Sequence, residues 1–164
     1  MRWLLLITVG GLFLTACTKT QSALEAYKAQ AAIDDKIVAQ YLQTNNLTGI
    51  AKKVSDTCGV YYIVLQPGQG NDVFTIATHV TVGDTGKLLS TGKVFTETNN
   101  FHPSYVLGQV ILGWQLGIPK IKQGGIVRLI IPSRYAYGPN AQTSVGLPAN
   151  AILDFDIQLY DVTN

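Results

Sequence analysis

The stretch AILDFDIQLYDV, residues 151–162, decides the fold class of this chain of 164 residues. Apolar and polar side chains alternate along it: Leu153, Phe155, Ile157 and Leu159 on one side, and Asp154, Asp156 and Gln158 on the other. Successive side chains of a β-strand point to opposite faces of its sheet, so the alternation predicts a strand with one packed face and one face in water. That division of faces is typical of an antiparallel sheet.

Three shorter stretches upstream also have strand patterns: residues 61–66, 78–82 and 126–131. The first closes at Pro67-Gly68, whose proline and glycine suit the two central positions of a type II turn. Residues 110–117 are the helix candidate between the strands, and they are short. The sequence therefore predicts an α+β fold in which the apolar face of an antiparallel sheet is covered by one short helix.

A region of helical character precedes the predicted sheet, at residues 18–57. Ser22 followed by Glu25 is a capping-box pattern, which predicts that a helix begins there. Apolar side chains then recur at helical spacing on either side of Asp34-Asp35: Leu24, Tyr27 and Ala31 before it, and Ile37, Val38, Tyr41 and Leu42 after it. Two interpretations stay open. The region is a solvated spacer with nascent helix, or its apolar stripe packs on the following domain or on a second chain.

The first residues of the chain have the pattern of an export signal. Met1-Arg2 gives a short positive start, and residues 3–14 form an apolar run. A run of about twelve residues is too short for the roughly twenty that cross a bilayer core, and it has the length of the apolar region of a signal peptide. We therefore expect residues 1–16 to be a signal peptide and the chain to be exported.

The end of this run, LTAC at residues 14–17, resembles the lipobox of bacterial lipoproteins. The resemblance implies cleavage before Cys17, acylation of Cys17 and attachment to a membrane of the bacterial cell envelope. Thr18 stands where an aspartate would resemble a signal for retention in the inner membrane, so we expect the outer membrane, with the protein facing the periplasm. The alternative is an ordinary secretory signal followed by a cysteine at this place by chance.

Composition and motifs argue against several classes of function. The chain has 12 basic and 10 acidic residues without a basic stripe, which argues against a nucleic-acid partner. Its two histidines, His79 and His102, and its two cysteines, Cys17 and Cys58, form no cluster with the spacing of metal ligands. The sequence has no nucleophile elbow and no phosphate-binding loop. We therefore expect no metal and no cofactor, and an enzyme here would act without covalent or proton-transfer chemistry.

Five aromatic and apolar motifs punctuated by glycines follow one another in the chain: TGKLL at 85–89, GKVF at 92–95, VILGW at 110–114, RYAYG at 134–138 and LPANAILDFDI at 147–157. Each motif alone fits ordinary core packing or a turn. In this order and spacing they resemble the FKBP family over roughly residues 58–164. The resemblance implies an antiparallel sheet wrapped on one short central helix, here preceded by the helical extension.

The resemblance also implies an activity, peptidyl-prolyl cis-trans isomerase (rotamase), here on Xaa-Pro bonds of exported proteins as they fold. The partners it implies are proline-containing polypeptides and the macrolide ligands of the family, with membrane contact through the N-terminal lipid. The chain then divides into a signal peptide at 1–16, a lipid anchor, tether and helical extension at 17–57, and an isomerase domain at 58–164. The alternatives are a non-catalytic FKBP-like module that binds prolyl segments or a partner, and a structural envelope lipoprotein.

The implied site is an aromatic pocket for the prolyl ring. Trp114 would form its floor, and Phe95 would form part of its wall. The Ile111 N–H and the Tyr137 hydroxyl would donate hydrogen bonds to substrate carbonyls, so these four residues are the expected catalytic set. Four further residues would complete substrate binding: Tyr105, Val110, Phe155 and, at the rim, Leu147.

Two positions of the pocket depart from the family pattern. Asp84 stands where the family usually has tyrosine, and Thr96 stands where it usually has aspartate. In the family those two side chains hydrogen-bond one another, and Asp84 and Thr96 offer a shorter, reversed pair of acid and hydroxyl. Pro103 takes another aromatic wall position. We therefore expect an intact apolar floor, one rebuilt polar side and reduced activity.

Overall fold

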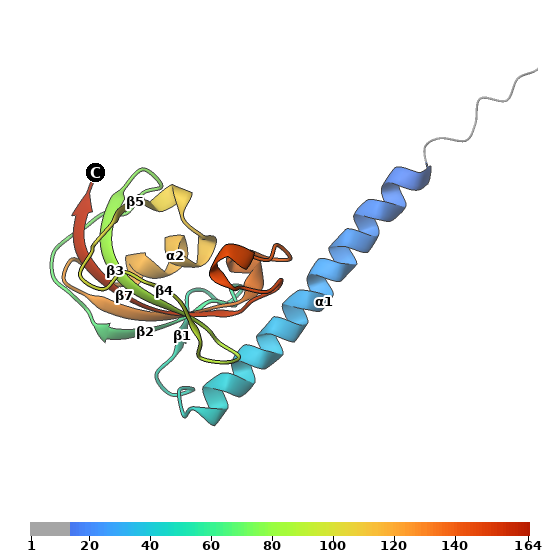
Figure 1. Ribbon diagram of the computed structural model, residues 1–164, viewed down its shortest axis with the longest axis horizontal. Helices are drawn as coiled ribbons and strands as arrows, with labels where there is room; N and C mark the ends of the chain where they lie inside the picture. The colour runs from blue at the N-terminus through green and yellow to red at the C-terminus, as the bar shows by residue number, and fades with distance from the viewer. Residues whose placement is uncertain (1–13) are drawn as a thin grey trace, which may run out of the picture.

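Figure 1 shows the computed structural model of the chain, which describes residues 14–164 and the side chains from residue 21 onward. The predicted signal peptide lies almost wholly outside the described residues, and so does the side chain of Cys17. The described part contains one sheet, a long helix α1 (Leu14–Thr44) and a short helix α2 (Leu112–Gly117). Within that part, no helix combines the length and the hydropathy that crossing a membrane requires.

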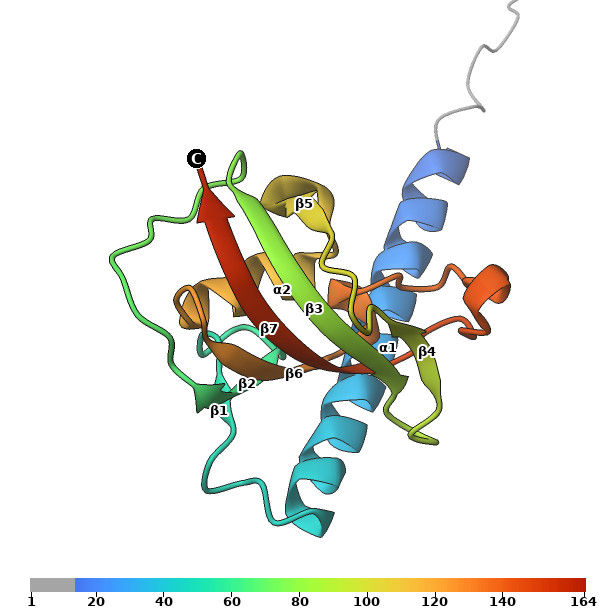
Figure 2. The same cartoon turned by 60° about the vertical axis from the view of Figure 1, so that its left-hand side comes forward.

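The sheet has seven strands and is antiparallel throughout, which confirms the predicted fold class. Its order is β1-β2-β6-β7-β3-β4, and β5 pairs with β3. The strands are β1 (Lys52–Lys53), β2 (Tyr61–Gln66), β3 (His79–Leu88), β4 (Val94–Glu97), β5 (Ser104–Val106), β6 (Ile126–Ile131) and β7 (Leu153–Thr163). The stretch predicted to be the deciding strand is β7, and it lies in the middle of the sheet between β6 and β3 (Figure 2).

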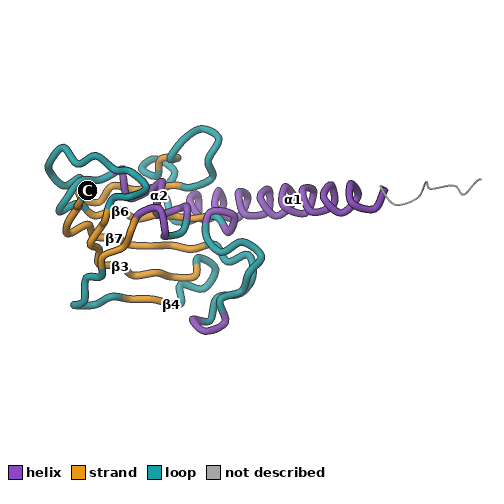
Figure 3. Tube along the Cα trace, turned by 90° about the horizontal axis from the view of Figure 1, so that it is seen from above, coloured by secondary structure: helices purple, strands orange, loops and turns teal. Residues whose placement is uncertain are grey.

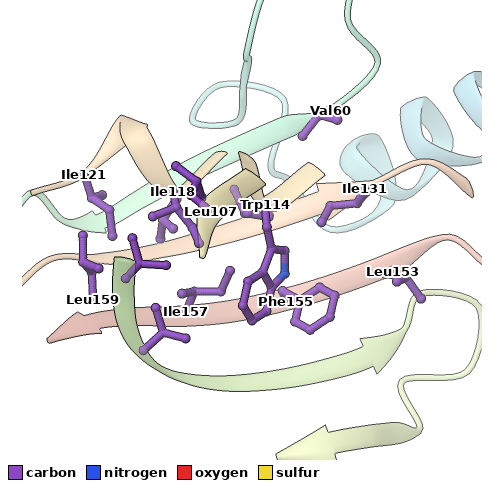
Figure 4. Close-up of a cluster of buried hydrophobic side chains, with 14 of the residues drawn as sticks. Val60, Leu107, Trp114, Ile118, Ile121, Ile131, Leu153, Phe155, Ile157 and Leu159 are labelled. Carbon is purple, nitrogen blue, oxygen red and sulfur yellow. The ribbon is translucent and has the colours of Figure 1, made fainter. Parts of the chain in front are cut away.

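The inner face of the sheet curves around α2 and holds the main core (Figures 2 and 4). Every second residue of β7 from Leu153 to Leu159 is buried there, as the alternation predicted. Side chains of α2, β6 and β3 join them, and the set is Leu153, Phe155, Ile157, Leu159, Trp114, Leu129, Ile131, Val80 and Val82. Gly113 lets α2 approach the sheet closely, because a Cβ at this position would lie 2.5 Å from Ile131. Short 3₁₀ turns complete the chain at Leu107–Gln109, Ile118–Lys120, Ser133–Tyr135 and Thr143–Val145.

Helix α1 is continuous and much longer than the capping-box pattern predicted. Ser22 lies inside it, so the prediction that a helix begins at Ser22 was wrong. The helix has no free first turn at this point, and Glu25 pairs instead with Lys28, at 3.2 Å. Residues 21–29 are exposed, and this part of α1 projects away from the sheet (Figure 3).

The C-terminal half of α1 packs on the outer face of the sheet. Val38 and Leu42 are buried against Ile130 of β6 and against Ile152. Leu24, in contrast, is 50% exposed. Of the two predicted apolar stripes, the second therefore packs on the following domain, and the first does not.

Polar contacts fix α1 at the same place. Asp34 is fully buried, and its carboxylate accepts hydrogen bonds from the Ser133 N–H at 2.8 Å and the Ser133 hydroxyl at 2.6 Å. Its neighbour Asp35 forms an ion pair with Arg134 at 2.7 Å. The Asp34-Asp35 pair, which separates the two stripes in the sequence, is therefore the attachment point of the helix to the segment that follows β6.

Asp154 corrects the prediction that the polar side of β7 faces water. Its side chain is buried and forms a two-pronged ion pair with Arg128 of β6, at 2.9 and 2.7 Å. Arg128 also donates to the hydroxyl of Tyr41 on α1, at 2.7 Å. The outer face of β7 is dry at Asp154 because α1 covers this end of the sheet, and the local alternation carries no sign of that cover.

Candidate functional site

A cavity of about 330 Å³ opens on the inner side of the sheet, between α2, the β3–β4 edge and the segment after β6. It is lined by Asp84, Phe95, Thr96, Tyr105, Gln109, Val110, Ile111, Trp114, Tyr137, Val145 and Phe155. These residues come from positions far apart in the chain. The cavity brings together all four residues of the expected catalytic set and three of the four expected substrate-binding residues.

Trp114 lines this cavity and is 6% exposed. Its indole packs edge to face against Phe155 at 5.2 Å and against Tyr105 at 5.8 Å between ring centroids. Phe95 packs in the same manner on Phe155, at 5.5 Å. Figure 4 shows the indole beside the Phe155 ring. Four rings therefore form a connected apolar surface, in the edge-to-face geometry that aromatic pairs prefer.

Gly86 on β3 makes room for this surface. A Cβ at Gly86 would lie 2.6 Å from Phe155 and 2.8 Å from Phe95, closer than real atoms approach. The pocket therefore requires glycine at this position of the TGKLL motif, because any side chain would push the two rings apart.

Donor groups stand at the edge of the apolar surface. Ile111 is the residue before α2, in extended backbone conformation, and its carbonyl accepts from the Trp114 N–H at 2.9 Å. In the described part of the chain, the Ile111 N–H has no acceptor and the Trp114 Nε1–H is buried without one. A ligand in the cavity can reach the Ile111 N–H, because Ile111 lines the cavity, whereas the Trp114 Nε1–H is enclosed by the protein.

Tyr137 reaches the cavity from the segment after β6. The turn at Ser133–Tyr135 begins this segment, and the buried Asp34 of α1 holds its first residue. The Asn150 N–H closes the segment on the other side by donating to the Gly138 carbonyl at 2.8 Å. The Tyr137 phenol is thus positioned by α1 and by the loop before β7, which the sequence alone did not indicate.

Asp84 provides the charge in the wall of the cavity. It follows Val80 and Val82 at alternate positions of β3 and so points to the same inner face, where it is 7% exposed. Burial raises the pKa of its carboxyl to about 6. Burial, and after it the negative charge of Asp84, also raises the pKa of the phenols of Tyr105 and Tyr137. The carboxylate and the two phenols therefore face a common space.

The structure differs from two sequence expectations about this wall. Among the described residues, the Asp84 carboxylate has no hydrogen bond to Thr96, although both line the cavity. Instead the backbone N–H of Asp84 donates to the Thr98 hydroxyl at 2.8 Å. Leu147, expected at the rim, is 2% exposed within the core, and Val145 lines the cavity in its place. A left-handed turn at Gly146 separates these two residues. Val145 therefore reaches the cavity, and Leu147 packs in the core.

The lining of the cavity offers apolar rings and a few hydrogen-bonding groups. Within the described residues, no group of three or more His, Cys, Asp or Glu side chains is placed to hold a metal ion. Gln109 and Val145 were missed from the sequence because neither belongs to a motif, and both are placed by short turns. Apolar rings with a few donors at their edge suit a ligand that is itself mostly apolar and carries carbonyl groups.

Comparison with known proteins agrees with this geometry. The family model of the FKBP-type peptidyl-prolyl cis-trans isomerases matches residues 72–160. The chain is 36% identical over 121 residues to the FKBP-type peptidyl-prolyl cis-trans isomerase FkpA of Buchnera aphidicola subsp. Schizaphis graminum, covering 73% of this chain and 46% of that protein. It is 38% identical over 107 residues to FK506-binding protein 1 of Candida glabrata, covering 63% of this chain and 93% of that protein.

A solved structure is similar over an even larger share of the chain. The crystal structure of FkpA from Escherichia coli covers 93% of this chain and 74% of its own, with a TM-score of 0.66 at 30% identity. The chain spans less than half the length of the Buchnera protein but nearly all of the Candida protein. The residues matched by the family model, 72–160, include β3, β4, β5, α2, β6 and most of β7, which surround the cavity. The chain therefore belongs to the family of FKBP-type peptidyl-prolyl cis-trans isomerases.

Proposed function

We propose that this protein catalyses the cis-trans isomerisation of Xaa-Pro bonds by holding the prolyl ring on Trp114. The observation that carries the proposal is the cavity itself, which gathers seven of the eight expected site residues around one apolar floor. Its volume of about 330 Å³ suits a prolyl residue with its two flanking peptide groups. The proposed catalytic set is Phe95, Ile111, Trp114 and Tyr137.

The proposed mechanism is binding of the twisted amide. Rotation about the Xaa-Pro bond must break amide resonance, which costs about 18–20 kcal/mol. The planar amide carries more charge separation than the twisted one, so an apolar cavity destabilises the ground state relative to the transition state. Only interactions that are stronger in the transition state accelerate the reaction. The walls formed by Trp114, Phe155 and Phe95 provide this environment.

The donors at the edge of the cavity would orient the substrate. The unpaired Ile111 N–H would bind the carbonyl on one side of the proline, and the Tyr137 hydroxyl would bind a second carbonyl. With the flanking groups held, the prolyl nitrogen can lose its planarity while the ring stays on the indole. No proton needs to be transferred in this sequence of steps.

A second candidate function is binding of prolyl segments without catalysis. It is favoured by Asp84 and Thr96, which change the polar side of the cavity while the apolar floor keeps the family pattern. The macrolide ligands of the family would occupy the same floor in either case.

Isomerase activity distinguishes these two candidates. The full chain in detergent micelles is mixed with a short peptide that contains one Xaa-Pro bond, and exchange between the cis and trans signals is followed by NMR. Uncatalysed exchange takes tens to hundreds of seconds, so we expect exchange cross-peaks within a mixing time of about a second once the protein is added. Peptide binding without any exchange would favour the non-catalytic module.

We further propose that the protein acts at the bacterial cell envelope, anchored through Cys17 to the outer membrane and facing the periplasm. The chain would then consist of a signal peptide (1–16), an anchor and helical extension (17–57) and the isomerase domain (58–164). The exposed residues 21–29 of α1 support this arrangement, because they hold the sheet away from the point of attachment.

The anchor is tested by the substitution Cys17→Ser. Without an acylated thiol, the mature protein should appear in the soluble envelope fraction, or the precursor should accumulate uncleaved. The matched control is Cys58→Ser, which changes a buried thiol far from the anchor and should leave the protein in the membrane fraction. Membrane fractionation of Cys17→Ser equal to that of the wild type would contradict the lipoprotein assignment.

A further inference from the structure

The wall of the cavity contains a carboxylate that the described part of the chain does not pair with a cation. Asp84 is 7% exposed, and it lines the cavity on the inner face of β3. Among the described residues, four ion pairs are formed, and Asp84 takes part in none of them. Its carboxylate oxygens have no hydrogen-bond partner in that part of the chain either, since the bonds of Asp84 run through its backbone.

The surroundings of Asp84 make this condition costly. Taking an ionised carboxylate out of water is unfavourable unless a cation or several hydrogen-bond donors replace the water. The groups that share its space are the Tyr105 and Tyr137 phenols and the apolar wall of Phe155 and Phe95. Because no cation of the described residues compensates the loss of water, burial raises the pKa of Asp84 to about 6. At neutral pH the carboxyl group is still mostly ionised.

Other acidic residues of the region do not share the position. Asp156 on the neighbouring strand β7 is half-exposed and paired with Lys87 at 3.2 Å. Glu97 at the end of β4 is exposed. Neither lines the proline pocket, so Asp84 is the acid that a bound peptide would meet.

A peptide in the pocket can supply a cation that pairs with the Asp84 carboxylate. A Lys or Arg side chain beside the proline would bring a cation to the carboxylate and would strengthen the bond because the site is partly desolvated. An Asp or Glu in the same place would add a second negative charge near the first. The same carboxylate therefore attracts one class of substrate and repels the other, which is how a single charge produces specificity.

We propose that Asp84 is a specificity-determining residue that selects Xaa-Pro segments with a Lys or Arg next to the proline and disfavours those with Asp or Glu. The inference rests on the proposed function, because it assigns a substrate class to the same pocket. It also gives a reason for the departure from the family's usual tyrosine at this position. The polar side of the pocket would then select the charge of the substrate, in addition to having lost the family's usual pair of side chains.

The test is a series of peptides that differ in one charge. Six short peptides carry Lys, norleucine or Glu immediately before or immediately after a single proline. Their kcat/KM values are measured by NMR exchange, and their Kd values by titration, with the full chain. We expect the Lys peptide to exceed the Glu peptide by about tenfold or more in at least one of the two positions, as a partly desolvated charge pair provides.

Two variants assign the preference to Asp84. Asp84→Asn should bring the ratio of Lys to Glu peptides close to one, whatever its absolute rate. Glu97→Gln is the matched control, since it removes the same charge from a nearby exposed strand end, and it should keep the preference of the wild type. The comparison is made at low and at moderate salt, because exposed charges are screened more strongly than buried ones.

The possible results separate this inference from the proposed function. Equal kcat/KM and Kd for Lys and Glu peptides with the wild type, or a preference that survives Asp84→Asn, would overturn the role of Asp84 while leaving a prolyl isomerase in place. A charge preference in Kd without any exchange would support Asp84 and remove the isomerase activity. Absence of both binding and exchange for all six peptides would overturn both.

Discussion

The cavity on the inner side of the sheet has an apolar side and a polar side, and the two differ in how they follow the family pattern. On the apolar side, Trp114, Phe155 and Phe95 form one connected aromatic surface with the residues the family resemblance implies. On the polar side, Asp84 and Thr96 replace the usual pair and do not bond one another. Under the proposed function, the apolar side binds the proline and the polar side selects the residues next to it.

The largest effect is expected on the apolar side. Trp114→Leu keeps bulk in the core but removes the indole, and we expect kcat/KM to fall by roughly a hundredfold or more, about 2.7 kcal/mol of transition-state binding. Trp114→Phe is the matched control, because it keeps a ring at the base and should retain most of the activity. Circular dichroism and thermal unfolding show whether each variant is folded.

Activity retained by a folded Trp114→Leu variant would contradict the proposed difference between the two sides, since the apolar floor would then not be the catalytic element. Equal losses in the Leu and Phe variants would point instead to the indole Nε1–H, the buried donor without a partner in the described part of the chain. Comparing the two losses of activity thus separates the contribution of an aromatic ring from that of the Nε1–H group.

A smaller effect is expected when the polar side is returned to the family pattern. The double variant Asp84→Tyr with Thr96→Asp restores the phenol and the acid, and we expect kcat/KM on norleucine peptides to rise about tenfold, or 1.4 kcal/mol. Each single change supplies one member of the family's pair without the other, so the two effects should not add. A double variant that is folded and slower than the wild type would show that Asp84 and Thr96 are an adaptation of the present substrate and not a loss.

The smallest effect concerns stability. The pKa of Asp84 rises from 3.8 to about 6 on folding because of burial, so the folded state binds this proton more tightly and loses stability as pH rises from about 4 to above 6. Asp84→Asn removes this loss. Since the group still reaches the cavity, we expect a gain in Tm of about 2–4 °C at pH 8, the shift that roughly 1 kcal/mol gives in a chain of this size.

The same measurement at pH 4 should show little difference between Asp84→Asn and the wild type, because Asp84 is protonated there in the folded state. Glu97→Gln, at an exposed position, should change Tm much less at either pH. A gain that is equal at pH 4 and pH 8 would mean that the carboxylate is not the cause.

The sheet and the apolar floor could be predicted because their signals are local. The alternation of β7 comes from the pleat of one strand, and the motif around Trp114 sets the start of one short helix. The outer face of β6 and β7 could not be predicted, because its burial depends on α1, which is more than eighty residues away from these two strands in sequence. The alternation predicts that Asp154 faces water, and the helical spacing places Asp34 between two apolar stripes. Contacts between distant parts of the chain bury both residues.

The polar side of the site was predictable in composition but not in geometry. The sequence showed that Asp84 and Thr96 replace the usual pair, and it suggested that they bond one another. The strand register decides otherwise, because Thr96 is opposite Gly86 and the Thr98 hydroxyl is the group that meets the Asp84 backbone. The exchange of Leu147 for Val145 at the rim has a similar cause, the left-handed turn at Gly146.

The central claim is that the prolyl ring binds on Trp114, and the indole Nε1–H reports it directly. The ¹⁵N-labelled full chain is titrated with a short peptide containing Lys-Pro, and the indole cross-peak of Trp114 is assigned by its loss in Trp114→Phe, since Trp3 is the other tryptophan. We predict that the Trp114 indole and the Ile111 amide shift together, with one Kd, and that a matched peptide with alanine in place of proline moves neither. Shifts of equal size with the alanine peptide, or peptide binding that leaves the Trp114 indole unmoved, would contradict the account.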